Sequence, residues 1–179
     1  MKTSQEPPFS LDAQIQEAAE RNADFVEGLD WQQTGHFAEA VQSFRKALEQ
    51  EPELPLFWTF YAWALAASGD VHGAISASRK AIAFDPEWGV AWNDLGEYLM
   101  ESGRVEEALF PIRRALRSRH FDRAHLAYMN LARYYLHLGQ LRRARQAAEE
   151  AHRLVPIFHP AKELAEWIRE RQEAWGIDD

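Results

Sequence analysis

The feature that most constrains this chain is a glycine that returns at an almost constant interval. The intervals are 34, 34 and 36 residues, between Gly35, Gly69, Gly103 and Gly139. Each glycine stands in the same local pattern, which predicts a helix, a tight turn and a second helix. A period in this range is typical of an array of stacked helical hairpins, not of a single closed globule.

When the units are aligned on these glycines, small and large side chains fall into separate columns. Small residues let two helix backbones approach closely, and large apolar residues alternate with them. The small columns are Gly28, Ala62, Gly96 and Ala132; Ala40, Ala74, Ala108 and Ala144; and Ala47, Ala81, Ala115 and Ala151. Three units close on a proline, which cannot continue a helix, at Pro52, Pro86 and Pro156.

This agreement of spacing, small residues and closing proline resembles the tetratricopeptide repeat. The resemblance covers four units, at 21–54, 55–88, 89–122 and 125–158. It implies an all-α fold, a right-handed α-solenoid of stacked antiparallel helix pairs. An amphipathic segment at 160–175 predicts one more helix that caps the last unit, which gives about nine helices in all.

The two ends and the third unit depart from the repeat. Residues 10–179 are expected to form one domain behind a disordered tail, 1–9. Ser10 is a candidate N-cap for a helix that starts at Leu11 and runs into the first helix of unit one. Unit three has His120 in place of its closing proline, and two extra residues follow it.

Composition removes several classes of function. The chain has no cysteine, so it holds no disulfide, no thiolate metal ligand and no cysteine nucleophile. Its histidines lack the spacing that places two imidazoles on one helix face. No Gly-rich phosphate loop and no nucleophile elbow occurs. We therefore expect no metal, no cofactor and no enzyme activity.

The location is expected to be cytoplasmic. The N-terminus shows no apolar signal-peptide core, and without a cysteine it offers no site for an N-terminal lipid anchor. No segment approaches the ~20 apolar residues that span a bilayer, so we expect no membrane partner.

Charge is distributed unevenly along the chain. The net charge is −8, and residues 1–90 alone account for it. By contrast, 104–145 holds ten arginines against three acidic residues, a local charge of +7. The arginine belt at 113–145 raises the hypothesis of nucleic-acid binding. The overall negative charge, and the lack of an aromatic column among the arginines, disfavour it.

In this family the first helix of each unit lines a concave groove, and the resemblance implies which residues face it. The candidate groove residues are Phe25, Leu29, Phe60, Trp63, Asn93, Asp94, Glu97, Asn130 and Arg133. The aromatic members predict an exposed apolar patch, unless residues 10–20 or a second copy of the protein cover it. The asparagines are candidates to bind a peptide backbone, and the acidic residues to select a basic side chain.

Some family members grip the C-terminal carboxylate of a chaperone's tail with Lys, Asn and Arg in the groove. Those positions here hold Phe25, Leu29, Phe60, Val90 and Asp94, none of which can clamp a carboxylate. The sequence therefore excludes that ligand.

The leading hypothesis is a non-enzymatic adaptor or scaffold that holds an extended or helical segment of another protein. A second hypothesis is a secretion-system chaperone or a pilus-assembly factor, because small bacterial arrays of this family serve both. Nucleic-acid binding through the arginine belt is the third.

Overall fold

The structure is a computed structural model that describes residues 9–176. The predicted disordered tail, 1–9, lies outside this range except for Phe9. The described residues form ten α-helices: α1 Leu11–Arg21, α2 Ala23–Gln33, α3 Phe37–Gln50, α4 Pro55–Ala67, α5 Val71–Phe84, α6 Gly89–Glu101, α7 Val105–Ala115, α8 Ala124–His137, α9 Leu141–Leu154 and α10 His159–Trp175.

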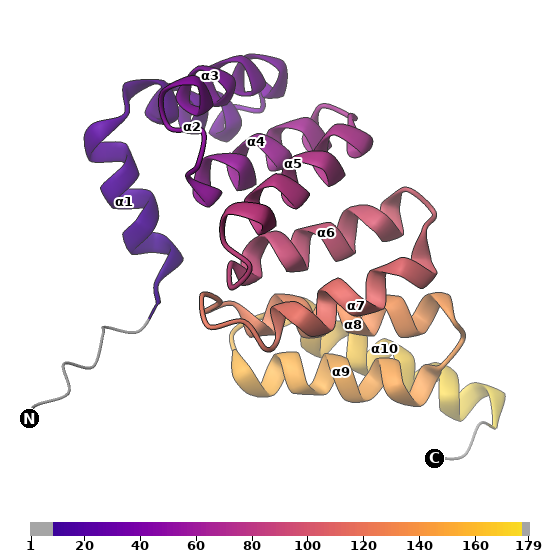
Figure 1. Ribbon diagram of the computed structural model, residues 1–179. Helices are drawn as coiled ribbons and strands as arrows, with labels where there is room; N and C mark the ends of the chain where they lie inside the picture. The colour runs from indigo at the N-terminus through magenta and orange to yellow at the C-terminus, as the bar shows by residue number, and fades with distance from the viewer. Residues whose placement is uncertain (1–8, 177–179) are drawn as a thin grey trace, which may run out of the picture.

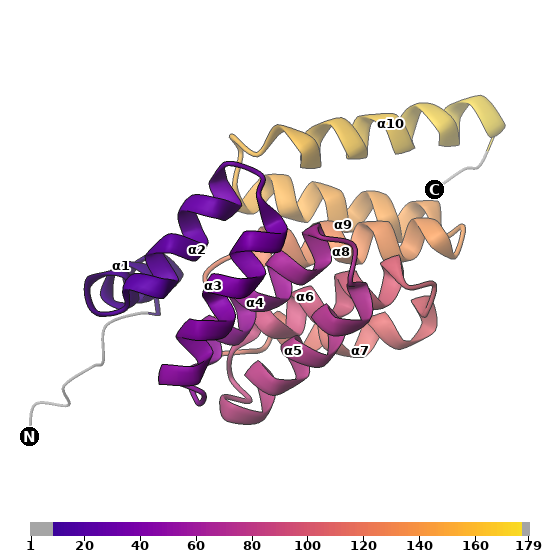
Figure 2. The ribbon, with the colours of Figure 1, turned by 90° about the horizontal axis from the view of Figure 1, so that it is seen from above.

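Helices α2 to α9 form four antiparallel pairs that stack one after another, as expected for a solenoid (Figure 1). The four turn glycines of the repeat take positive φ angles between 67° and 95°, a backbone conformation that glycine adopts without steric cost. Helix α10 packs against α9 and lies on the side of the array opposite to α5 and α7 (Figure 2).

The helix count is ten and not nine because the N-terminal helix does not continue into the first repeat. Ser10 caps α1 as predicted, since its hydroxyl accepts a hydrogen bond from the Ala13 amide at 3.3 Å. The chain then breaks at Asn22, whose backbone is extended. The Asn22 side chain accepts from the Phe25 amide at 2.9 Å and so starts α2 as a new helix.

The break lets α1 turn back along the array and reach the insertion that follows unit three. The Leu11 amide donates to the Asp122 carboxylate at 3.0 Å, and Arg123 pairs with Asp12 at 2.6 Å. The two extra residues of the third unit therefore lie where the N-terminal helix docks.

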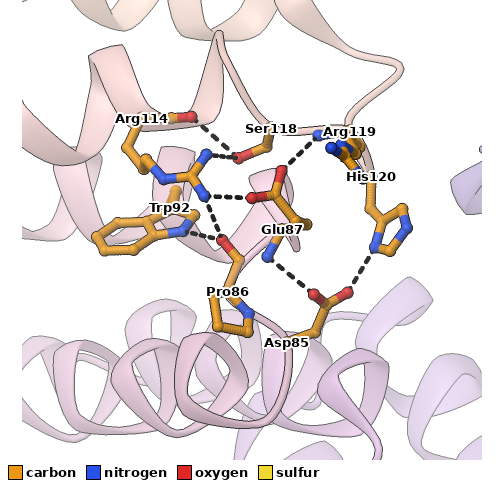
Figure 3. Close-up of polar contacts among 8 residues, drawn as sticks. All are labelled: Asp85, Pro86, Glu87, Trp92, Arg114, Ser118, Arg119 and His120. Atoms are coloured by element: carbon orange, nitrogen blue, oxygen red, sulfur yellow. Dashed lines mark hydrogen bonds and ion pairs between the residues drawn. The ribbon is translucent and has the colours of Figure 1, made fainter.

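His120, which replaces the closing proline of unit three, belongs to a polar junction between units two and three (Figure 3). Its imidazole Nδ1 lies 2.6 Å from the Asp85 carboxylate. Its backbone also exchanges hydrogen bonds with this loop, because its amide donates to the Glu87 carbonyl and its carbonyl accepts from the Gly89 amide. Glu87 accepts in turn from the Arg114 guanidinium and the Arg119 amide. The junction thus joins the two units by side-chain and backbone contacts.

Gly96 is one of the positions where the two helices of a pair pack closely. A Cβ atom added there would lie 2.5 Å from Cγ1 of the buried Ile112. We expect Gly96→Ala to lower the free energy of unfolding by up to about 2 kcal/mol. The better helix propensity of alanine, worth about 1 kcal/mol, offsets only part of a typical overpacking cost of about 1–3 kcal/mol. Urea unfolding would measure this, and unchanged stability would mean that α6 and α7 separate easily.

Candidate functional site

The structure divides the nine candidate groove residues into two groups. Phe25 and Phe60 are 0% and 3% exposed, so the prediction of an exposed aromatic patch is wrong for them. The ring of Phe25 lies 4.8 Å from that of Phe57 and 5.0 Å from that of Phe60, between centroids. Leu29 is half-buried beside this cluster.

These rings are buried because the aromatic side chains of units one and two pack against one another. Helix α1 adds Leu11 and Ala18 to the same buried cluster. This is an intramolecular cover of the kind considered for residues 10–20. The front of the array therefore offers these rings to no ligand.

The other six candidates come together around one pocket of about 340 Å³. Three consecutive inner helices supply them: Trp63 from α4; Asn93, Asp94 and Glu97 from α6; Asn130 and Arg133 from α8. The remaining wall is mainly apolar and consists of Leu126, Met129, Phe158 and Pro160. We call this space the polar pocket.

A chain of hydrogen bonds crosses the polar pocket from α4 to α8. The Trp63 indole and the Asn93 amide both donate to the Asp94 carboxylate, the second at 3.2 Å. Asn130 donates to the Asn93 oxygen at 3.1 Å, so both amides are buried and bonded within the protein. The sequence assigned these asparagines to a peptide backbone, but in the structure they fix the position of Asp94.

The second carboxylate of the pocket is held differently. Arg133 donates to Glu97 at 2.9 Å, and the guanidinium is more than half exposed. Because Arg133 also donates to the Asn130 oxygen at 3.3 Å, it closes the network on the α8 side. Glu97 therefore has one ion-pair partner, and its side chain stays 34% exposed.

Burial changes the acidity of these groups. Loss of hydration raises the pKa of Asp94 to about 7, and the nearby charge of Glu97 adds to this rise. Burial and the charge of Glu97 also raise the pKa of Glu101, one turn further along α6. A substantial fraction of Asp94 therefore keeps its proton at neutral pH.

An adjoining pocket of about 450 Å³ was not found from the sequence. It lies between α8 and α10 and shares Met129, Arg133 and Pro160 with the polar pocket. Its other lining residues are Leu136, Glu163, Leu164 and Trp167. We call this space the apolar pocket, and the two together the inner groove.

Sequence reasoning missed the apolar pocket because it treated 160–175 only as a cap. The available signal was the apolar face of that segment, which has Leu164 and Trp167 one turn apart. In the structure Trp167 stays 42% exposed under the stacked guanidinium of Arg171. A helix that caps the array therefore also extends its binding surface.

Comparison with known proteins agrees with this architecture. The family model described as Tetratricopeptide repeat matches residues 25–87 and 93–156. The search of curated proteins finds no match. Within the described residues, no helix combines the length and the apolar character that crossing a membrane requires.

Three solved structures illustrate the likeness of the fold. The pilF protein of Pseudomonas aeruginosa has a TM-score of 0.78 and 23% identity, over 90% of this chain and 72% of that chain. The thermophilic TPR protein TTC0263 of Thermus thermophilus has a TM-score of 0.73 and 16% identity, over 87% of each chain. The first TPR of Spaghetti, bound to an HSP90 peptide, has a TM-score of 0.60 and 21% identity, over 69% of this chain and 94% of that chain. Because the family model matches most of the residues of this chain, the chain belongs to the tetratricopeptide repeat family.

Proposed function

We propose that this protein is a non-enzymatic adaptor that holds a segment of a partner protein in the inner groove. The observation that carries the proposal is that two unlike pockets adjoin there, across α4, α6, α8 and α10. Ligand sites are typically concave and mainly apolar, with a few placed polar groups, and the inner groove has this composition. A tetratricopeptide domain of the same fold has been solved with a bound peptide.

The two pockets favour a segment with two neighbouring side chains of different chemistry. An apolar side chain fits between Leu136, Leu164 and Trp167, where an exposed tryptophan offers a large contact area. A basic side chain fits the polar pocket, because the carboxyl groups of Asp94 and Glu97 line it together with a single arginine, Arg133. Adjoining pockets mean that the two side chains are close together in the bound segment.

The test uses peptides selected from a random display library against the whole protein. Trp167→Ala is expected to weaken the selected peptides at least tenfold, since it removes the exposed wall of the apolar pocket. The matched control is Trp175→Ala, on the same helix and exposed but in neither pocket. Circular dichroism would show that both variants stay folded, and isothermal titration would give the affinities.

Equal affinities for wild type and Trp167→Ala would contradict the groove assignment.

The likeness to pilF shows the fold alone at 23% identity. A role in pilus assembly or as a secretion chaperone is therefore a narrower form of the same proposal, in which the bound segment belongs to a pilus component or an exported protein.

A further inference from the structure

A second charged surface lies on α7 and α9, away from the inner groove. Two pockets of about 400 and 390 Å³ occur there, the first on α7 and the second at the start of α9. We call the surface the basic face and define it by Phe110, Arg113, Arg117, Arg142 and Arg143, which line these pockets. It belongs to the stretch 104–145, whose local charge is +7.

The arginines of the basic face differ from Arg114 and Arg145 in their pairing, although the carboxylate of Glu106 also lines the first pocket. Within residues 9–176, no ion pair involves the four guanidinium groups of this face. By contrast, Arg114 pairs with Glu87 in the polar junction (Figure 3), and Arg145 pairs with Glu149. Arg114 and Arg145 thus have acidic partners within the protein. The four arginines of the basic face form no such ion pair in the described part of the chain and can bind an external anion.

Tyr135 of α8, which is 8% exposed, contacts one arginine from each of the two pockets. Arg113 of α7 donates to its hydroxyl at 3.3 Å, and the Arg143 guanidinium of α9 lies 5.7 Å from the centre of its ring. Arg143 also donates to the Gln140 oxygen at 2.9 Å. Two of the four guanidinium groups are therefore held in place before any ligand arrives, which lowers the entropy cost of binding.

Phe110 gives the basic face an apolar anchor. Its side chain is 68% exposed, and its ring packs edge-on against Trp92 at 5.7 Å between centroids. An exposed phenylalanine in a pocket with Arg113 and Arg117 combines hydrophobic contact with charge-assisted hydrogen bonds.

We infer that the basic face binds a short acidic polypeptide segment that carries an apolar residue. Guanidinium groups match carboxylates in geometry as well as charge. A short segment responds only to the local charge, since salt screens charges beyond about 8 Å at physiological ionic strength. A long nucleic acid would also meet the excess negative charge of residues 1–90, and the pocket linings offer its bases one ring, Phe110, for stacking.

The experiment measures fluorescence anisotropy of a short labelled peptide of glutamates and two leucines, with the full chain at physiological ionic strength, about 0.15 M. Arg117→Gln combined with Arg142→Gln is expected to weaken binding at least tenfold. The control, Lys80→Gln with Arg169→Gln, removes the same charge from exposed positions outside both pockets and is expected to bind like the wild type. Phe110→Ala is expected to weaken the leucine-containing peptide but not an all-glutamate peptide.

Three results would overturn the inference: no binding of the acidic peptide at physiological ionic strength, equal weakening by the control pair, or tighter binding of a single-stranded oligonucleotide of the same charge. The last result would assign the basic face to nucleic acid. Because Trp167→Ala leaves the basic face intact, it is expected to bind the acidic peptide normally, which separates this test from that of the inner groove.

Discussion

Replacing Phe60 with alanine is expected to lower the free energy of unfolding by about 3–5 kcal/mol, the range found for phenylalanine removed from a packed core. The Phe60 ring is enclosed by three aromatic neighbours, with centroids 5.0 Å from Phe25, 5.7 Å from Phe44 and 4.6 Å from Trp63. Its removal leaves a cavity between units one and two that rigid rings cannot fill. Urea unfolding followed by circular dichroism would measure the loss.

The matched control is Phe110→Ala, which removes the same side chain from an exposed position. We expect a cost within about 0.5 kcal/mol there, the usual range for surface substitutions. If both variants lost the same stability, the aromatic cluster at the front of the array would not be a core. A Phe60→Ala protein with normal stability and reduced partner binding would instead restore the front patch as a binding surface.

Local signals made much of the fold predictable from the sequence. The glycine period predicted the turns, because each turn needs a residue with positive φ, and in the described residues of each unit the turn glycine alone has one. Ser10 acts as a helix cap as expected, and its hydroxyl accepts from the Ala13 amide at 3.3 Å. Such features depend on residues three or four positions apart, which a single sequence contains completely.

The contents of the groove were harder to predict, because they depend on segments distant in the sequence. The family register indicates which helix face points inward, but not that α1 would turn back at Asn22 and add Leu11 to the cluster around Phe25. It also gives no sign that Asn93 and Asn130 would bond to each other across two units. Six of the nine candidate residues nevertheless line one pocket, since the stacking of equivalent helices brings equivalent positions together.

The polar pocket has a consequence for stability that a pH series would detect. The pKa of Asp94 is about 7 in the folded protein, against about 3.9 for an unperturbed aspartate. Between these values the folded chain holds a proton that the unfolded chain has released. Stability contributed by the protonated carboxyl is therefore lost as the pH rises from about 4 to about 7, by up to about 4 kcal/mol.

Asp94→Asn is expected to remove this loss. Asparagine is neutral and nearly the same shape, and its oxygen can still accept from the Trp63 indole. The variant should match the wild type within about 1 kcal/mol at pH 4 and exceed it by about 2–4 kcal/mol at pH 8, where the wild type must bury a charge. Urea unfolding at a series of pH values would measure the difference.

Subtracting the unfolding free energies of the two proteins at each pH cancels the contributions of groups that titrate in both. His125, whose pKa burial lowers, affects each in the same direction, and so does Glu101. Parallel stability curves for variant and wild type would show that the Asp94 carboxyl is ionised and hydrated throughout. Diverging curves would mean that the Asp94 carboxyl keeps its proton in the folded protein without a ligand. A basic side chain of a bound partner would displace that proton. Binding at the polar pocket would then weaken as the pH falls below about 7.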